Sequence, residues 1–134
     1  TGLSFSPDYS MLYIGSFGGG MIYQLPVDPD GNPGELDILV PNVGGGMLDG
    51  MAVDACGNVY VCEYIAALVW RITPDGQNMA PIANFSSDTS WIPNMQWGSG
   101  VGGWDENVLY VLDIASNTFY EVPIEVPGKP RQYP

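Results

Sequence analysis

The chain has 134 residues and a formal net charge of −12, with 3 Lys and Arg against 15 Asp and Glu. Such a surface repels phosphate backbones and anionic lipid, so we expect no nucleic-acid partner and no membrane partner. The chain has no histidine, which excludes histidine-dependent triads and histidine metal ligands. With 18 glycines, 12 prolines and only 13% charged residues, the composition predicts one domain of short strands joined by tight turns.

The sequence repeats itself along its length. Gly2–Ile14 returns as Gly50–Val61, and Met21–Leu25 returns as Leu68–Ile72. A looser third copy consists of Asn94–Gly98, Asn107–Asp113 and Thr118–Val122. The period is about 47 residues, and a period of this size with four strands per unit is typical of β-propeller blades.

Each unit is expected to be a small antiparallel sheet. The first strands are predicted to begin near Gly2, Gly50 and Asn94, and a fourth strand is expected over 35–43 and over 79–85. The turns carry proline, glycine and aspartate, which favour tight reversals. We therefore predict an all-β fold, a β-propeller of about three four-stranded blades that make up half of a six-bladed ring. The predicted blades are 1–44, 45–90 and 91–127, the third without its outer strand, followed by a tail at 128–134. A β-sandwich is the alternative.

Three blades cannot close a ring, so both flanks of the group would stay open. We expect the ring to be completed by a missing N-terminal half or by a second copy of the chain. The chain begins at Thr1, inside an expected strand, which suggests a mature or cut amino terminus. The scarcity of lysine and the sequon at Asn84 favour an extracellular or periplasmic location.

Several residue groups have a functional and a structural interpretation. The spacing Asp28-x-Asp30-x-Asn32 begins like a calcium loop, but position 12 is Leu39, so we interpret it as a hairpin turn. Trp91, Trp97 and Trp104 surround a glycine-rich segment and could stack on a sugar, but packing between blades is the preferred interpretation. Cys56 lies in a turn and Cys62 well along the next strand, too far apart for a disulfide, so we expect two thiols.

Two stretches carry a resemblance to a known family. The segment Leu48–Asp54, followed by Gly57–Val61, resembles the P-D-G-M-x-x-D-x-x-G-x-L-W-V signature of the gluconolactonase / senescence marker protein family. Thr1–Asp8, followed by Leu12–Ile14, is similar to its N-G-L-A-F-S-P-D blade, and the end of the chain resembles the C-terminal end of the family. The resemblance maps the chain onto the last three blades of a six-bladed propeller that hydrolyses sugar lactones with a divalent metal.

The resemblance also implies a site. The family holds one cation, usually Ca²⁺, with a Glu, two Asn and an Asp, and oxygen ligands of this kind suit a hard cation. Asp49 matches the family Asp, which is also a candidate base, and Thr1 stands where the family has an Asn. The remaining ligands would belong to the other half of the ring. One copy of this chain is therefore expected to be inactive.

Two further residues and two functions remain open. Asn94 begins an inner strand and Glu63 ends a second strand, so both are candidates for substrate binding, although a turn residue and a solvated strand end are the plainer interpretations. The first function is part of a divalent-metal-dependent lactone or ester hydrolase, with a small lactone or ester as substrate. The alternative is a non-catalytic propeller that binds a partner and has lost its metal cage. The intact motif around Asp49 favours the first, and Thr1 favours the second.

Overall fold

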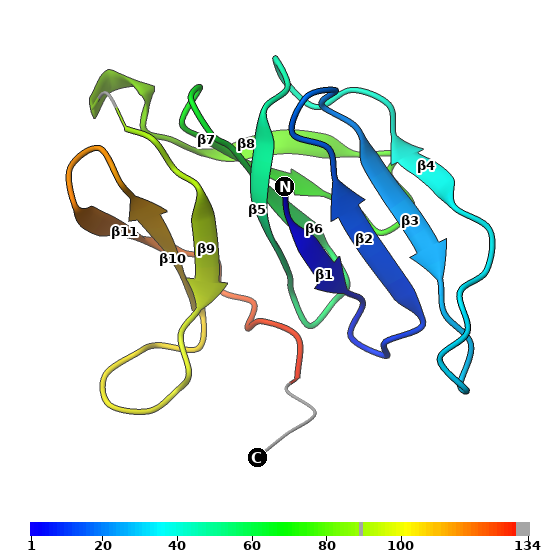
Figure 1. Ribbon diagram of the computed structural model, residues 1–134. Helices are drawn as coiled ribbons and strands as arrows, with labels where there is room; N and C mark the ends of the chain where they lie inside the picture. The colour runs from blue at the N-terminus through cyan, green and yellow to red at the C-terminus, as the bar shows by residue number, and fades with distance from the viewer. Residues whose placement is uncertain (89, 131–134) are drawn as a thin grey trace.

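A computed structural model describes residues 1–88 and 90–130, which form three antiparallel sheets that follow one another in the chain (Figure 1). Blade 1 has the strand order β1-β2-β3-β4, blade 2 has the order β5-β6-β7-β8, and blade 3 has β9-β10-β11. The strands are β1 (Leu3–Phe5), β2 (Met11–Gly15), β3 (Ile22–Pro26), β4 (Asp37–Val40), β5 (Leu48–Val53), β6 (Val59–Glu63), β7 (Leu68–Ile72), β8 (Met79–Asn84), β9 (Asn94–Trp97), β10 (Val108–Asp113) and β11 (Thr118–Pro123). The predicted propeller fold is confirmed.

The inner strands lie side by side, as the repeat predicts. β5 contacts β1 on one side and β9 on the other, so the three first strands gather along one line in the middle of Figure 1. They begin at Leu3, Leu48 and Asn94, within two residues of the predicted starts. The β-sandwich is excluded, because the sheets fan out from this line instead of stacking as two layers. Only one helical turn, the 3₁₀ helix Ser86–Asp88, occurs in the described part of the chain.

The core consists of two layers, one in each junction between blades. Tyr13 and Ile22 of blade 1 pack against Val59 and Val61 of blade 2. The opposite face of blade 2 packs against blade 3, where Tyr60 meets Trp97 with ring centroids 4.9 Å apart in an edge-to-face arrangement. Alternate residues of one strand therefore serve two different cores, as the period of two in a β-strand requires.

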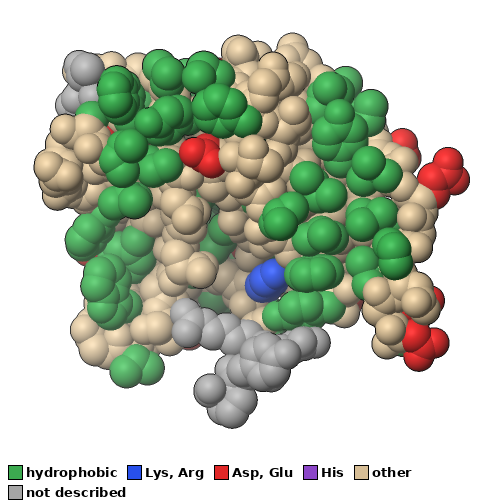
Figure 2. Space-filling view, viewed as in Figure 1, with side chains coloured by type: hydrophobic (Ala, Val, Ile, Leu, Met, Phe, Trp, Pro, Cys, Tyr) green, Lys and Arg blue, Asp and Glu red, His purple; other side chains and the backbone are tan. Residues whose placement is uncertain are grey.

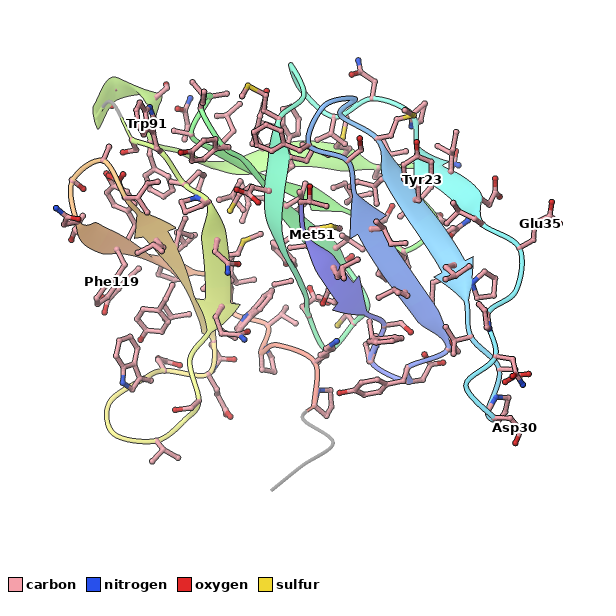
Figure 3. The ribbon with its side chains drawn as sticks, viewed as in Figure 1. Tyr23, Asp30, Glu35, Met51, Trp91 and Phe119 are labelled. Atoms are coloured by element: carbon pink, nitrogen blue, oxygen red, sulfur yellow. The ribbon has the colours of Figure 1, made fainter. Side chains whose placement is uncertain are left out.

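The turns behave as the aspartates and prolines predict. At the hairpin between β3 and β4, the Asp28 carboxylate accepts hydrogen bonds from the backbone N–H groups of Asp30 and Asn32 at 3.0 and 2.8 Å. The Asn32 side-chain amide also donates to this carboxylate, and its hydrogen bonds, followed by that from the Asn32 backbone N–H, lower the pKa of Asp28. The hairpin interpretation of this segment is confirmed, and Asp30 lies at its tip (Figure 3).

The C-terminal segment crosses beneath the inner strands. Gly128 forms an isolated bridge with Asp54, and the Lys129 backbone N–H donates to Val53 O at 3.0 Å. The Lys129 ammonium donates to Phe5 O at 2.8 Å and lies 5.0 Å from the ring centroid of Tyr9. This segment therefore ties blade 3 to the ends of β5 and β1. None of the helices in residues 1–88 and 90–130 is long and apolar enough to cross a membrane.

Candidate functional site at the channel mouth

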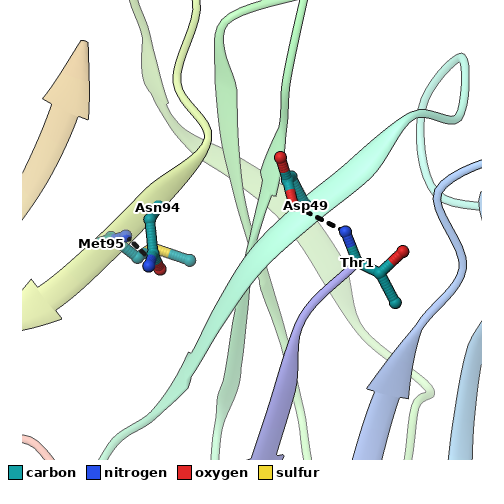
Figure 4. A network of polar contacts seen from close by, with 4 residues as sticks. All are labelled: Thr1, Asp49, Asn94 and Met95. Atoms are coloured by element: carbon teal, nitrogen blue, oxygen red, sulfur yellow. Dashed lines mark hydrogen bonds and ion pairs between the residues drawn. The ribbon is translucent and has the colours of Figure 1, made fainter. Parts of the chain in front are cut away.

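Three of the four predicted site residues lie at the starts of the inner strands. Thr1 precedes β1, Asp49 is the second residue of β5, and Asn94 is the first residue of β9 (Figure 4). We call these three residues the channel mouth. Because β5 lies between β1 and β9, Asp49 occupies the middle of the group.

A β-bulge places Asp49 at the mouth. The register between β5 and β6 shifts between Leu48 and Met51, because Leu48 faces Glu63 while Met51 faces Val61. Asp49 and Gly50 together therefore oppose one residue of β6, Cys62. A bulge of this kind bends the strand and redirects a side chain, and bulges are common beside functional sites. The sequence alone gave no signal for it.

Gly50 allows β5 and β9 to approach each other at the mouth. Its N–H donates to Pro93 O at 2.7 Å, and a Cβ at this position would lie 2.5 Å from both the Cα and the Oδ1 of Asn94. Any larger residue would push the two strands apart. The close approach brings the Asn94 amide oxygen next to the strand that carries Asp49, although this oxygen also accepts from the Met95 N–H at 2.9 Å.

The carboxylate of Asp49 remains accessible, with 28% of its side chain exposed. Its Oδ1 accepts a hydrogen bond at 2.6 Å from the Thr1 ammonium, a backbone group, and not from the Thr1 hydroxyl. Behind the mouth, burial and then the negative charge of Asp49 raise the pKa of Cys62 to about 12. Cys62 is therefore a buried thiol at neutral pH and cannot act as a nucleophile.

Glu63, the fourth predicted residue, lies in a different environment. Its side chain is only 4% exposed, its Oε1 accepts from the Gly45 N–H at 2.6 Å, and its Oε2 accepts from the Trp70 indole at 2.8 Å. The predicted solvated strand end is wrong, because the carboxylate is buried and fully bonded. Its substrate role stays a prediction, which this environment does not favour.

The other groups considered in the sequence separate in space. Trp97 is buried against Tyr60 of blade 2, which agrees with packing between blades. Trp91 is 45% exposed beside Tyr64, and Trp104 is 47% exposed against Tyr110, so the three tryptophans form no common patch. Both cysteines are free thiols, as predicted.

The oxygen donors of the mouth fit part of a cation site. One carboxylate, one amide oxygen and one hydroxyl come from Asp49, Asn94 and Thr1, whereas Ca²⁺ takes six to eight oxygens. No group of three or more His, Cys, Asp or Glu side chains that could hold a metal occurs within residues 1–88 and 90–130. Hard-cation chemistry is therefore compatible with these donors, and most of the ligands would have to come from outside this chain.

A cavity of 920 Å³ lies at the other ends of the inner strands. It is lined by the ends of β1, β5 and β9 together with the C-terminal segment, including Phe5, Val53, Trp97 and Lys129. Phe5 and Lys129 are in contact here. The mouth and the cavity thus occupy opposite ends of the same three strands.

Comparison with known proteins decides the family. Residues 1–114 match the SMP-30/gluconolactonase/LRE-like region. The chain belongs to this family. Among curated relatives, the 6-deoxy-6-sulfogluconolactonase of Pseudomonas putida is 33% identical over 118 residues, which cover 87% of this chain and 38% of that protein.

Solved structures show the same fold. Regucalcin of Agrobacterium tumefaciens, a calcium-binding protein, superimposes with a TM-score of 0.71 at 21% identity and covers 98% of this chain and 47% of its own. A luciferin-regenerating enzyme gives a TM-score of 0.69 at 18% identity, over 96% of this chain and 46% of that one. This family member therefore spans less than half the length of the relatives that it matches.

Proposed function

We propose that this chain supplies part of the metal- and substrate-binding mouth of a gluconolactonase-type hydrolase that acts on sugar lactones. The observation that carries the proposal is the placement of Asp49. An accessible carboxylate stands on a bulge at the start of the central inner strand, close to Thr1, and the next residue, Gly50, lies against Asn94. The sulfogluconolactonase relative supports a lactone of a sugar acid as the substrate class.

Each mouth residue has a defined role in this proposal. Asp49 and Asn94 would hold the cation through their side-chain oxygens, with the Thr1 hydroxyl as a weaker third ligand. The bound cation supplies a Lewis acid for the lactone carbonyl. The Asp49 carboxylate orients the attacking water and accepts its proton, because it is the one acidic group among the three mouth residues. The bond between the carbonyl carbon and the ring oxygen then breaks, the ring oxygen takes the proton from Asp49, and the product is the open hydroxy acid.

Substrate contacts extend from the same residues. The Asn94 side chain, exposed at the start of β9, can donate from its amide nitrogen to a sugar hydroxyl. We do not extend this role to Glu63, whose oxygens are bonded to Gly45 and Trp70. Because the mouth supplies only part of a cation site, one copy of the chain is proposed to be inactive.

The test requires a closed ring, formed by a longer chain that contains these blades or by a second copy. Hydrolysis of a panel of sugar-acid lactones is measured by acid release with added Ca²⁺ and with chelator. Asp49→Asn preserves the shape and removes the charge, and we expect its kcat/KM to fall about 100-fold or more. Asp30→Asn, at the exposed hairpin tip (Figure 3), is the matched control and should leave kcat/KM unchanged. Equal activities of the two variants would overturn the proposal.

A non-catalytic calcium-binding propeller is the second candidate. It is favoured by the calcium-binding regucalcin, which has the same fold. The same two variants, Asp49→Asn and Asp30→Asn, distinguish this candidate from the hydrolase. Ca²⁺ binding measured by calorimetry would be weakened by Asp49→Asn and not by Asp30→Asn, while no lactone of the panel would be hydrolysed.

A further inference from the structure

Three aromatic side chains form a row at the same end of the molecule as the channel mouth. Phe17 follows β2, Tyr64 follows β6 and Trp91 precedes β9, while β2 and β6 end beside the starts of β1 and β5. The ring centroid of Tyr64 lies 6.3 Å from that of Phe17 and 6.2 Å from that of Trp91. We call these three residues the aromatic row. It runs from blade 1 to the entry of blade 3, so it lies within the three-blade group and not on its flanks.

Backbone hydrogen bonds hold Tyr64 between two segments that lead to the mouth. Its N–H donates to Met47 O at 3.0 Å, and its carbonyl accepts from the Ile92 N–H at 3.2 Å. Met47 and Ile92 each precede a mouth residue, Asp49 or Asn94, by two positions. Two residues of extended chain span about 7 Å, so a small substrate whose ring lies at Asp49 can reach the row.

The loops of the two outer members of the row are held in the same way. The Trp91 N–H donates to Asp113 Oδ1 at 3.1 Å. The loop of Phe17 is bound to the segment that enters β5, because the Val43 N–H donates to Gly20 O at 2.8 Å. None of these bonds uses a side chain of the row, so an aromatic side chain can be replaced while its loop keeps its position.

The row is apolar and open to solvent beside a polar mouth. Phe17 is 38% exposed and Trp91 is 45% exposed, although both are large hydrophobic residues. Ile65, which follows Tyr64, and Ile114, whose N–H donates to Trp91 O at 3.0 Å, are exposed as well. Figure 2 shows hydrophobic side chains gathered at the upper left, the end of the molecule where Figure 3 labels Trp91. Grouped exposed apolar side chains of this kind indicate a binding surface.

The angles between the rings decide which ligand the row can take. The ring of Tyr64 is tilted by 46° to that of Phe17 and by 56° to that of Trp91. A rigid ring, such as that of a second sugar, stacks on one aromatic face and cannot lie along several faces that are tilted to one another. A flexible alkyl chain can follow all of them by rotation about its single bonds. The row therefore favours an alkyl chain over a second sugar.

We propose that the aromatic row binds an alkyl substituent of the lactone, which extends from a ring held at Asp49 across Tyr64 to Trp91. This inference rests on the proposed function for the lactone ring and adds to it the class of substituent. The polar mouth would bind the ring oxygens, and the row would remove the chain from water, a division that is typical of small-molecule sites. Each methylene buried in this way increases the affinity roughly fourfold.

Two lactones that differ only in the chain test the proposal in the closed ring used for the lactone assay. γ-Nonalactone carries a pentyl group on the ring of γ-butyrolactone. We expect the wild-type protein to hydrolyse γ-nonalactone with a kcat/KM at least about tenfold higher, because the burial of two or more methylenes supplies that factor. Gluconolactone, which has no alkyl chain, tests the proposed function separately.

Substitutions of two tryptophans locate the site. Trp91→Ala should lower the ratio of the two kcat/KM values roughly fivefold or more, and Trp91→Phe should retain most of the ratio because an aromatic ring remains. Trp104→Ala is the matched control, since Trp104 is similarly exposed at 47% but lies in the loop between β9 and β10, at the other end of the strands. It should leave the ratio unchanged. A loss of folded protein lowers both kcat/KM values equally and does not alter their ratio.

Binding measurements separate failure of this inference from failure of the proposed function. If no lactone is hydrolysed, the proposed function is wrong, and calorimetry with γ-nonalactone and γ-butyrolactone then tests the row by itself. The dissociation constant of γ-nonalactone should rise roughly fivefold or more in Trp91→Ala and stay unchanged in Trp104→Ala. A wild-type protein without preference for γ-nonalactone, or the same preference in Trp91→Ala as in Trp104→Ala, would overturn the inference in either measurement.

Discussion

The Trp70 indole of β7 donates a hydrogen bond to Glu63 Oε2 of β6 at 2.8 Å. Blade 3 repeats this relationship with different residues, because the Tyr120 hydroxyl of β11 donates to Asp113 Oδ2 of β10 at 3.2 Å. Each carboxylate also accepts from a backbone N–H three residues before the inner strand of its own blade, Glu63 from Gly45 and Asp113 from Trp91. In each of these two blades, the acidic residue of the second strand and the aromatic residue of the third strand thus connect both strands to the loop that precedes the inner strand.

This fastening predicts the consequence of removing Glu63. Glu63→Ala should lower the free energy of unfolding by about 2–3 kcal/mol, because it leaves the Trp70 indole and the Gly45 N–H without their buried acceptor. Urea denaturation measures the loss. Glu35→Ala, in the exposed loop before β4 (Figure 3), should be neutral. An increase in KM for a lactone with unchanged stability would instead support the predicted substrate role of Glu63.

Asp54 is a second buried carboxylate with a structural role. The sequence suggests that it only satisfies local amides in a turn, with a cost of about 1 kcal/mol or less on substitution. The structure shows more: Asp54 is fully buried and accepts from Cys56 N, Asn58 N, Asn58 Nδ2 and the Tyr60 hydroxyl. The expectation of a small cost is therefore revised.

Asp54→Asn should cost about 2–4 kcal/mol of stability, because the amide NH₂ faces donors where the carboxylate accepted. The matched control is Asp75→Asn, since Asp75 accepts from Thr73 and Gln77 in an exposed turn after the third strand of the same blade. Thermal or urea unfolding should show a clearly smaller change for Asp75→Asn. Equal losses of stability in the two variants would indicate that the burial of Asp54 and its hydrogen bonds adds nothing to the free energy of unfolding.

The repeat made the fold predictable because its signals are local and periodic. Alternating apolar residues in Met11–Gly15 and Val59–Glu63, and turn residues such as Asp28, specify strands and hairpins without knowledge of the rest of the chain. Tyr13 and Tyr60, 47 residues apart, then place the sheets in equivalent positions.

The site was less predictable because its features depend on neighbours in space. The bulge at Asp49 is visible only in the pairing of β5 with β6, and the closeness of Gly50 to Asn94 only in the packing of β5 on β9. The burial of Glu63 depends on its contact with Trp70 of the next strand. Its position at the end of a strand therefore led the sequence analysis to predict a solvated side chain.

The two thiols should differ in reactivity. Cys56 is exposed, while Cys62 is buried with its pKa raised to about 12 by burial and the charge of Asp49. Iodoacetamide at pH 8 should therefore label one cysteine in the native chain and two in denaturant, because the thiolate is the reacting form. Mass spectrometry of the peptides identifies the site. Native labelling of Cys62 at the rate of Cys56 would contradict this packing of β6.

The lowered pKa of Asp113 predicts how the free energy of unfolding depends on pH. Burial alone would raise its pKa, but hydrogen bonds from Ser116 Oγ and from the N–H groups of Trp91 and Ala115 lower it well below the ordinary value of 3.8. The unfolded chain therefore binds this proton more readily than the folded one. The stabilisation is complete above about pH 5 and is lost progressively as the pH falls below 3.8 towards the lower folded-state pKa.

Asp113→Asn removes this titration and one negative charge. Urea midpoints measured from pH 7 to pH 2 should show wild type more stable than Asp113→Asn above pH 5, with the difference shrinking as the pH falls through the window below 3.8. Asp30→Asn, on the exposed hairpin tip, controls for the loss of one surface charge. A constant difference between wild type and Asp113→Asn down to pH 2 would show that the ionised carboxylate is not what stabilises the entry to blade 3.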